Sequence, residues 1–225
     1  GGRFEESLPP ESSAGVVGLT VGDLDADGRL DLVTLDAAGV VWRSSWDSTQ
    51  WDTQEVVTWS SFPEGTTAGS HRVVLGDLDN NGALDLLASG DFGTQVWLAD
   101  ERSHLSVFKG TILAEVFGVA DLTGDGWLDL VGLEGGTPVR LVGKGSAGYG
   151  WQQIRPRAHI AAGDQRINSF GVGGEIEVRA GLLVQKQVLT GAPVHFGLGT
   201  QEATDVARIY WPNGVMQADF EFATD

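Results

Sequence analysis

Three segments of the 225-residue chain repeat one pattern of nine residues, and this repeat limits the possible folds more than any other feature. Each segment has Asp at positions 1 and 9, Gly at position 6 and a mostly acidic residue at positions 3 and 5. We name them loop one (residues 23–31), loop two (77–85) and loop three (121–129). Their first residues lie 54 and 44 residues apart. Such periods are typical of β-repeat arrays and propeller blades, whereas helical solenoids repeat at about 33–34 residues.

Short apolar and β-branched runs flank each loop, and another follows a turn rich in Gly, Asp or Glu. These runs predict antiparallel strands. No stretch shows a 3.6-residue apolar period, so we expect little helix. The predicted strands are residues 16–21, 32–35 and 40–43 around loop one, 71–75, 86–89 and 94–98 around loop two, and 115–119, 130–133 and 138–142 around loop three.

The repeat ends near residue 143, where a Gly/Ser-rich connector runs to residue 150. No acidic loop follows it, and the remaining sequence predicts a second β unit. We therefore expect a repeat domain at residues 1–150 and a small β domain at residues 151–225. The strands predicted in the second domain are residues 151–155, 174–180, 182–189, 195–198 and 206–211.

The spacing of the acidic residues fits calcium coordination. Ca²⁺ takes six to eight oxygen ligands in a forgiving geometry, and a short loop can surround it when alternate side chains turn inward. Positions 1, 3, 5 and 9 would supply side-chain oxygens, position 7 its backbone carbonyl, and Gly at position 6 permits the sharp turn. Strict octahedral Mg²⁺ fits less well. The alternative is a set of metal-free hairpin turns, which also favour Asp, Asn and Gly.

This interpretation predicts up to three Ca²⁺ ions. The Thr in loop three is a neutral and weaker ligand. Unlike an EF-hand, no loop has Glu at position 12, and strands rather than helices flank the loops. The predicted ligands are Asp23, Asp25, Asp27, Asp31 and the carbonyl of Arg29; Asp77, Asp79, Asn81, Asp85 and the carbonyl of Ala83; and Asp121, Thr123, Asp125, Asp129 and the carbonyl of Trp127.

Residues 15–142, with their three Asp-rich loops between strands, resemble FG-GAP/VCBS repeats, the units of integrin α-subunit propellers and of many bacterial exported proteins. The resemblance implies propeller blades with calcium held between neighbouring strands. Propellers usually have four to eight blades, and only three loops are present here. Blades could be missing, degenerate strands could come from residues 1–20 and 45–70, or the blades could close differently.

Residues 151–219 resemble an ASPIC/UnbV domain, a small β module often found after FG-GAP repeats. The stretches that support this are His195-Phe196-Gly197-Leu198-Gly199 and, later, Trp211-Pro212-Asn213-Gly214. The resemblance implies a fold and a context but no reaction. The expected fold class is thus all-β: a partial or small β-propeller-like array of calcium-loop blades with a C-terminal small β domain.

No catalytic constellation is visible, so we expect no enzyme. The chain has no Cys, no Gly-x-Ser-x-Gly elbow and no phosphate-binding glycine motif, and its four histidines are widely separated. A paired-carboxylate glycosidase cannot be recognised from sequence alone. A carbohydrate-active enzyme or its accessory subunit therefore stays open as an alternative function.

The acidic balance opposes binding to nucleic acid, because 31 Asp and Glu against 14 Lys and Arg give a formal charge of −17. No apolar run is long enough for a transmembrane helix, and the given chain begins with no signal peptide. The favoured hypothesis is a calcium-stabilised extracytoplasmic module (secreted, periplasmic or cell-surface) that offers a rigid β surface to a protein or glycan partner. A further alternative is a structural subunit that assembles through open repeat edges.

Overall fold

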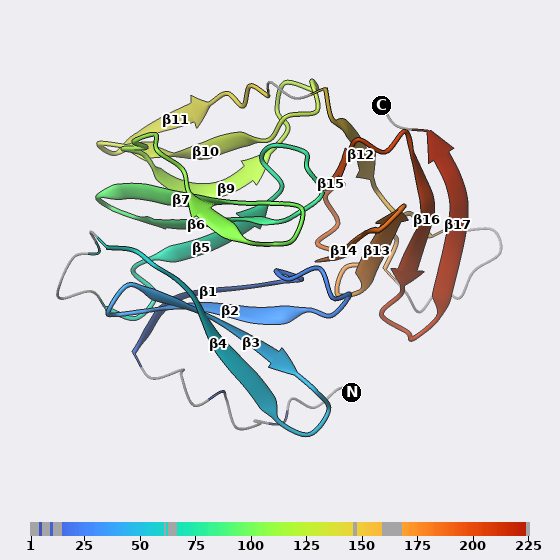
Figure 1. Ribbon diagram of the computed structural model, residues 1–225, viewed down its shortest axis with the longest axis horizontal. Helices are drawn as coiled ribbons and strands as arrows, with labels where there is room; N and C mark the ends of the chain where they lie inside the picture. The colour runs from blue at the N-terminus through green and yellow to red at the C-terminus, as the bar shows by residue number, and fades with distance from the viewer. Residues whose placement is uncertain are drawn as a thin grey trace.

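The computed structural model describes residues 5, 10, 15–60, 62, 67–145, 148–158 and 168–223, and these form 17 β-strands and no helix. Three antiparallel sheets come from the repeats and two from the C-terminal part (Figure 1). Strands β1–β11 are called the repeat region here, and β12–β17 the C-terminal unit. Within the described ranges, no helix is long and apolar enough to cross a membrane.

Each repeat folds into its own antiparallel sheet, in which consecutive strands pair as neighbours. The first two sheets have four strands, and the described part of the third has three. The first sheet consists of β1 (Val16–Gly22), β2 (Asp31–Asp36), β3 (Val40–Trp46) and β4 (Trp51–Thr58); the second of β5 (Arg72–Gly76), β6 (Asp85–Gly90), β7 (Gly93–Ala99) and β8 (Leu105–Val107); the third of β9 (Glu115–Ala120), β10 (Asp129–Glu134) and β11 (Thr137–Leu141).

The C-terminal unit contains one two-stranded and one four-stranded antiparallel sheet, with the orders β12-β15 and β14-β13-β16-β17. One apolar core, which includes Phe196 and Ile176, lies between the two sheets. The strands are β12 (Gly150–Ile154), β13 (Glu175–Ala180), β14 (Leu183–Val188), β15 (Val194–Gly199), β16 (Ala203–Tyr210) and β17 (Met216–Ala223).

Neighbouring sheets of the repeat region share apolar cores. Val33 of the first sheet and Trp97 of the second belong to one buried cluster. Leu87 of the second sheet and Val116 of the third belong to another. Figure 1 shows the three sheets arranged one above another on the left, with the C-terminal strands on the right. Successive sheets therefore stabilise each other face to face, as burial of apolar surface requires.

The expected all-β class is confirmed, and all nine strands predicted around the loops are present within a few residues. Three further strands, β4, β8 and β17, were not among those predicted. None of the sheets closes on itself. A propeller-like arrangement accordingly stays a prediction, as do the two expected domains.

Candidate metal centres

The three loops join the first two strands of their sheets, and they share one backbone conformation. In each loop the carboxylate at position 1 accepts hydrogen bonds from the N–H groups of positions 5 and 6. For Asp23 both distances are 3.0 Å, and for Asp77 they are 3.1 and 2.8 Å. Asp121 accepts the equivalent bonds at 3.3 and 2.9 Å. The repeat seen in the sequence is thus also a repeat of hydrogen bonds.

The carboxylate at position 9 closes each loop in the same way. Its Oδ2 accepts a hydrogen bond from the N–H of position 2, and its Oδ1 accepts one from the residue fourteen positions further on, which lies near the end of the third strand or just beyond it. The donors to Oδ1 are the Ser45 hydroxyl for Asp31 and backbone N–H groups for Asp85 and Asp129. Position 9 therefore ties each loop to the end of its own sheet.

Two positions in every loop adopt left-handed backbone angles. The glycines at position 6 have φ between 82° and 94°, a region that residues with a Cβ avoid. Position 4 is also left-handed and is occupied by Ala26, Asn80 and Gly124. The position-5 side chain accepts a hydrogen bond from the N–H of position 7 in all three loops. These constraints give all three loops the same tight turn.

Loops one and two each bring three carboxylates together. In loop one they are Asp23, Asp25 and Asp27, and in loop two Asp77, Asp79 and Asp85. Within each group one oxygen per residue lies within 4.8 Å of the others. Two oxygens bound to one Ca²⁺ at 2.3–2.6 Å are at most about 5 Å apart. Both clusters could therefore hold a metal ion, and their oxygen-only donor set fits Ca²⁺.

Asp31, predicted as the fourth carboxylate of loop one, is not part of that cluster. Its oxygens are bound by Ser45 and the Leu24 N–H. In loop two the predicted ligand Asn81 uses its Oδ1 to accept from the Ala83 N–H at 2.8 Å.

Loop three differs, and among the described residues its three carboxylates form no such cluster. Thr123 stands at position 3 and contacts Asp121 at 3.4 Å. Asp129 is fully buried, whereas Asp125 is exposed. The predicted side-chain ligands of loop three, and the predicted carbonyl ligands of all three loops, stay predictions.

Burial and mutual repulsion oppose ionisation in the first two loops. Burial raises the pKa of Asp23 to about 7, and the nearby charges of Asp27 and Asp31 add to it. Burial likewise raises the pKa of Asp85 to about 7 and that of Asp77 well above its usual value. A bound cation would remove this cost by neutralising the carboxylates.

Asp121 of loop three shows the opposite shift. Burial by itself would raise the pKa of its carboxyl group, but hydrogen bonds from the N–H groups of Gly126, Gly124 and Asp125 outweigh it and the pKa is lowered. The carboxylate is therefore already stabilised by the backbone. Loop three has less need of a cation than the other two loops.

Arginines already pair with the carboxylates of loop one. Arg43 from β3 forms an ion pair with Asp25. Arg29 contacts Asp27 through Nε at 2.9 Å and Nη2 at 2.6 Å. Among the described residues, no Lys or Arg forms such a pair with an aspartate of loop two. A cation at loop one must compete with these guanidinium groups.

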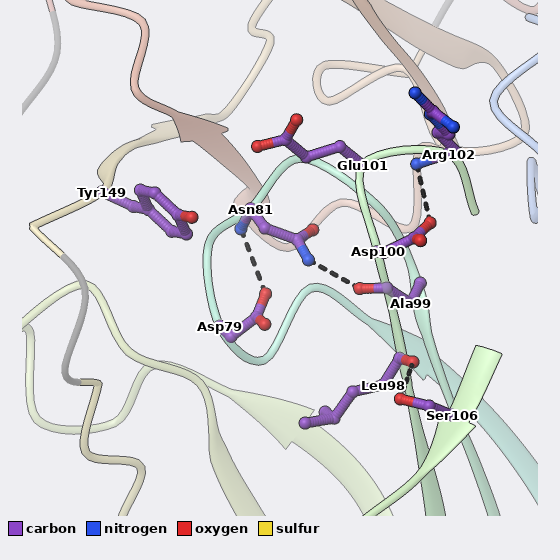
Figure 2. Close-up of a pocket in the computed structure, with 9 residues that line it drawn as sticks. All are labelled: Asp79, Asn81, Leu98, Ala99, Asp100, Glu101, Arg102, Ser106 and Tyr149. Carbon is purple, nitrogen blue, oxygen red and sulfur yellow. Dashed lines mark hydrogen bonds between the residues drawn. The ribbon is translucent and has the colours of Figure 1, made fainter. Parts of the chain in front are cut away.

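A pocket of about 530 Å³ opens beside loop two. Figure 2 shows the Asp79 carboxylate and the Asn81 amide on one side, and the turn after β7 opposite them. Asp79, which is half-buried, is the only member of the loop-two cluster that lines it. A cation could reach the buried Asp77 and Asp85 from here. The lining residues are Asp79, Asn81, Leu98, Ala99, Asp100, Glu101, Arg102, Ser106 and Tyr149.

The loops also contact the C-terminal unit, which the sequence did not predict. The Asn80 side chain of loop two lies 2.7 Å from the Nε2 atom of His195 in β15. The Gly199 N–H donates to the backbone carbonyl of Asn80 at 2.8 Å. An asparagine in a left-handed position is only a weak signal, and a contact across 115 residues leaves no local pattern.

The three described histidines lie in different surroundings. His71 is buried among Trp59, Phe62 and Phe92, His195 stacks on Trp151, and His104 is exposed. The fourth, His159, lies outside the described residues. Trp97 is buried in the core shared by the first two sheets, while Trp42 is half-buried and donates to Asp36.

Comparison with known proteins gives no assignment: no family model matches this chain, and no curated protein sequence matches it.

Proposed function

We propose that this chain is a calcium-stabilised extracytoplasmic module that presents a rigid β surface to a protein or glycan partner. The observation that carries the proposal is the threefold loop, with the same hydrogen bonds at positions 1, 5 and 9 and converging carboxylates in loops one and two. Loops one and two each take one Ca²⁺, and loop three is a weaker third site.

The FG-GAP/VCBS resemblance, and the ASPIC/UnbV resemblance after it, support the extracytoplasmic and propeller-like parts of this proposal. Face-to-face packing of the three repeat sheets is also what neighbouring propeller blades require. Calcium here is structural: it neutralises buried carboxylates and so adds its binding free energy to folding.

Calcium titration calorimetry on the full chain, with thermal unfolding in calcium and in chelator, tests the proposal. A site that binds only the folded chain adds about 2.7 kcal/mol at a hundredfold excess of Ca²⁺ over Kd. For a chain of this size that corresponds to a rise in Tm of roughly 5–11 °C for each site. Equal Tm values in calcium and chelator, with no heat of binding, would refute it.

A pair of matched variants separates loop chemistry from total charge. Asp79→Asn removes one negative charge from the loop-two cluster, and Asp52→Asn removes one from the exposed face of β4. The first should weaken calcium binding and reduce the calcium-dependent rise in Tm, and the second should change neither. Equal effects of both variants would mean that calcium acts through diffuse charge. Partner binding is then tested by glycan arrays probed with and without calcium.

An assembling structural subunit is a second candidate, favoured by the third sheet. Its outer strand β11 has no further partner among the described strands, and an unpaired edge can accept a strand from another chain. Light scattering over a range of protein concentrations tests this candidate. A monomer at every concentration, in calcium and in chelator, would exclude it.

A further inference from the structure

The C-terminal unit packs against all three loops at the same position. Glycine occupies position 6 in each loop, and next to each glycine lies a side chain from β12, β13 or β14. The neighbours are Val184 and Glu177 for Gly28, Leu183 for Gly82 and Trp151 for Gly126. In Figure 1 the C-terminal strands lie beside the loop ends of the repeat sheets. The C-terminal unit therefore covers each candidate metal loop on the side of its position-6 glycine.

Loop two is held more firmly than its neighbours, through the fully buried Asn80. Its Oδ1 pairs with His195 Nε2 at 2.7 Å, and its Nδ2 donates to the Gly126 carbonyl in loop three at 2.9 Å. Its own backbone carbonyl accepts from the Gly199 N–H at 2.8 Å. One residue thus joins loop two to loop three and to the C-terminal unit, and every polar atom of its side chain takes part.

The equivalent residues show that the loop backbone does not need this side chain. Position 4 is Ala26 in loop one and Gly124 in loop three, and all three have left-handed φ between 58° and 74°. Asn80 is therefore explained by its contacts outside the loop. It lies between Asp79, a member of the loop-two cluster, and Asn81, a predicted ligand.

β15 approaches loop two so closely that only glycine fits at one position. A methyl group on Gly197 would overlap the Asp77 carboxylate and the backbone of Asn80. Asp77 is the buried first residue of the loop-two cluster. β15 therefore lies in direct contact with a candidate ligand.

We propose that Asn80 is a positioning residue through which the docked C-terminal unit holds loop two in its cation-binding conformation. The proposal rests on the calcium binding proposed above. Because the loop is already held in place, calcium binding loses less conformational entropy. Because coupling is reciprocal, calcium at loop two must also strengthen docking of the C-terminal unit by the same factor.

Asn80→Gly tests the coupling, because glycine keeps the left-handed backbone and removes the side chain that carries the amide. Its matched control is Ala26→Gly, the same backbone change at position 4 of loop one. Calcium affinity of each loop is measured by calorimetry on the full chain, with an Asp→Asn change at position 3 or 5 of the other two loops. Asn80→Gly should weaken calcium binding at loop two by about fivefold or more. Ala26→Gly should weaken calcium binding at loop one by clearly less.

Gly197→Ala tests the same coupling from the other side, since it pushes β15 away without changing any loop residue. Its control is Gly148→Ala, where an added methyl meets nothing within 4 Å. The first variant should lower the calcium affinity of loop two, and the second should leave it unchanged. Should Gly197→Ala fail to fold, hydrogen exchange on the unaltered chain decides. Calcium should then slow exchange in β12 and β15 by about the same factor of five or more.

The outcomes separate the two proposals. A chain that binds no calcium at loop two overturns both. A chain that binds calcium, but whose Asn80→Gly and Gly197→Ala variants bind it equally well, overturns only the role of Asn80. Exchange in β12 and β15 that is insensitive to calcium also overturns that role. Weaker binding in both variants, with unchanged controls, supports it.

Discussion

Lowering the pH should weaken calcium binding at loops one and two but hardly at loop three. Burial raises the pKa of Asp23 and of Asp85 to about 7, so below pH 7 a proton occupies each group and the metal must displace it. Far below the pKa, each further pH unit lowers the calcium affinity tenfold, or by 1.36 kcal/mol of binding free energy. For one group with a pKa of 7, the loss between pH 7 and pH 5 is about 50-fold, or about 2.3 kcal/mol. The lowered pKa of Asp121 predicts little change for loop three over the same interval.

Calcium titration calorimetry at pH 5, 6, 7 and 8 measures this, in two buffers that differ in ionisation enthalpy. The buffer dependence counts the protons released. Near pH 6 this number should approach one per ion at loop one and exceed one at loop two, where the pKa of Asp77 is raised as well as that of Asp85. The sign follows from the direction of the shift. A raised carboxyl pKa means that the calcium-free fold holds protons which the calcium-bound fold and the unfolded chain do not. Calcium affinities that match at pH 5 and pH 7, with no proton release, would refute the buried-carboxylate argument.

Three further outcomes are expected. Arg29→Ala, which reproduces the alanine at position 7 of loop two, should tighten calcium binding at loop one up to about fivefold in calorimetry, because a solvent-exposed ion pair no longer competes for Asp27. Unchanged or weaker binding would contradict this. Trp97→Ala should lower the unfolding free energy by about 3–5 kcal/mol in urea titration, whereas Trp46→Ala, at a half-exposed position, should change the unfolding free energy little. The pKa of His71 is lowered because the side chain is buried, so its contribution to stability is present above pH 6.5 and lost as the pH falls. The difference in unfolding free energy between the unaltered chain and His71→Phe, measured in calcium, should therefore shrink from pH 8 to pH 5. A constant difference would be inconsistent with a lowered pKa of His71.

The strands next to the loops could be predicted because each has at least one buried face. β6, for example, is buried at every residue and contains the apolar run Leu86-Leu87-Ala88. The strands β4 and β8 were missed because they are outer strands with mostly exposed or half-buried residues, so no apolar alternation marks them. β17 was missed for a similar reason, since Met216 and Phe220 are exposed on an outer strand.

The candidate site could be predicted in its local part only. The nine-residue pattern identified the loops, because its ligands, its glycine and its closing hydrogen bonds are all near in sequence. It gave no sign of Arg43, which comes from the third strand of the sheet and pairs with Asp25. It also gave no sign of the contact between Asn80 and His195. Such partners depend on how the sheets pack, which local spacing does not encode.

Part of the acidic excess of the chain follows from this arrangement. Ten of its 31 acidic residues lie in the loops, and five of those ten are almost fully buried: Asp23, Asp31, Asp77, Asp85 and Asp129. A buried carboxylate must be neutralised or fully hydrogen-bonded to be tolerated. Backbone N–H groups supply two bonds to several of them, yet those at Asp23 and Asp85 leave the pKa near 7. A proton or a cation must offset the remaining free-energy cost of burying these carboxylates. At neutral pH, where protons are scarce, the calcium ions proposed for loops one and two would meet that requirement.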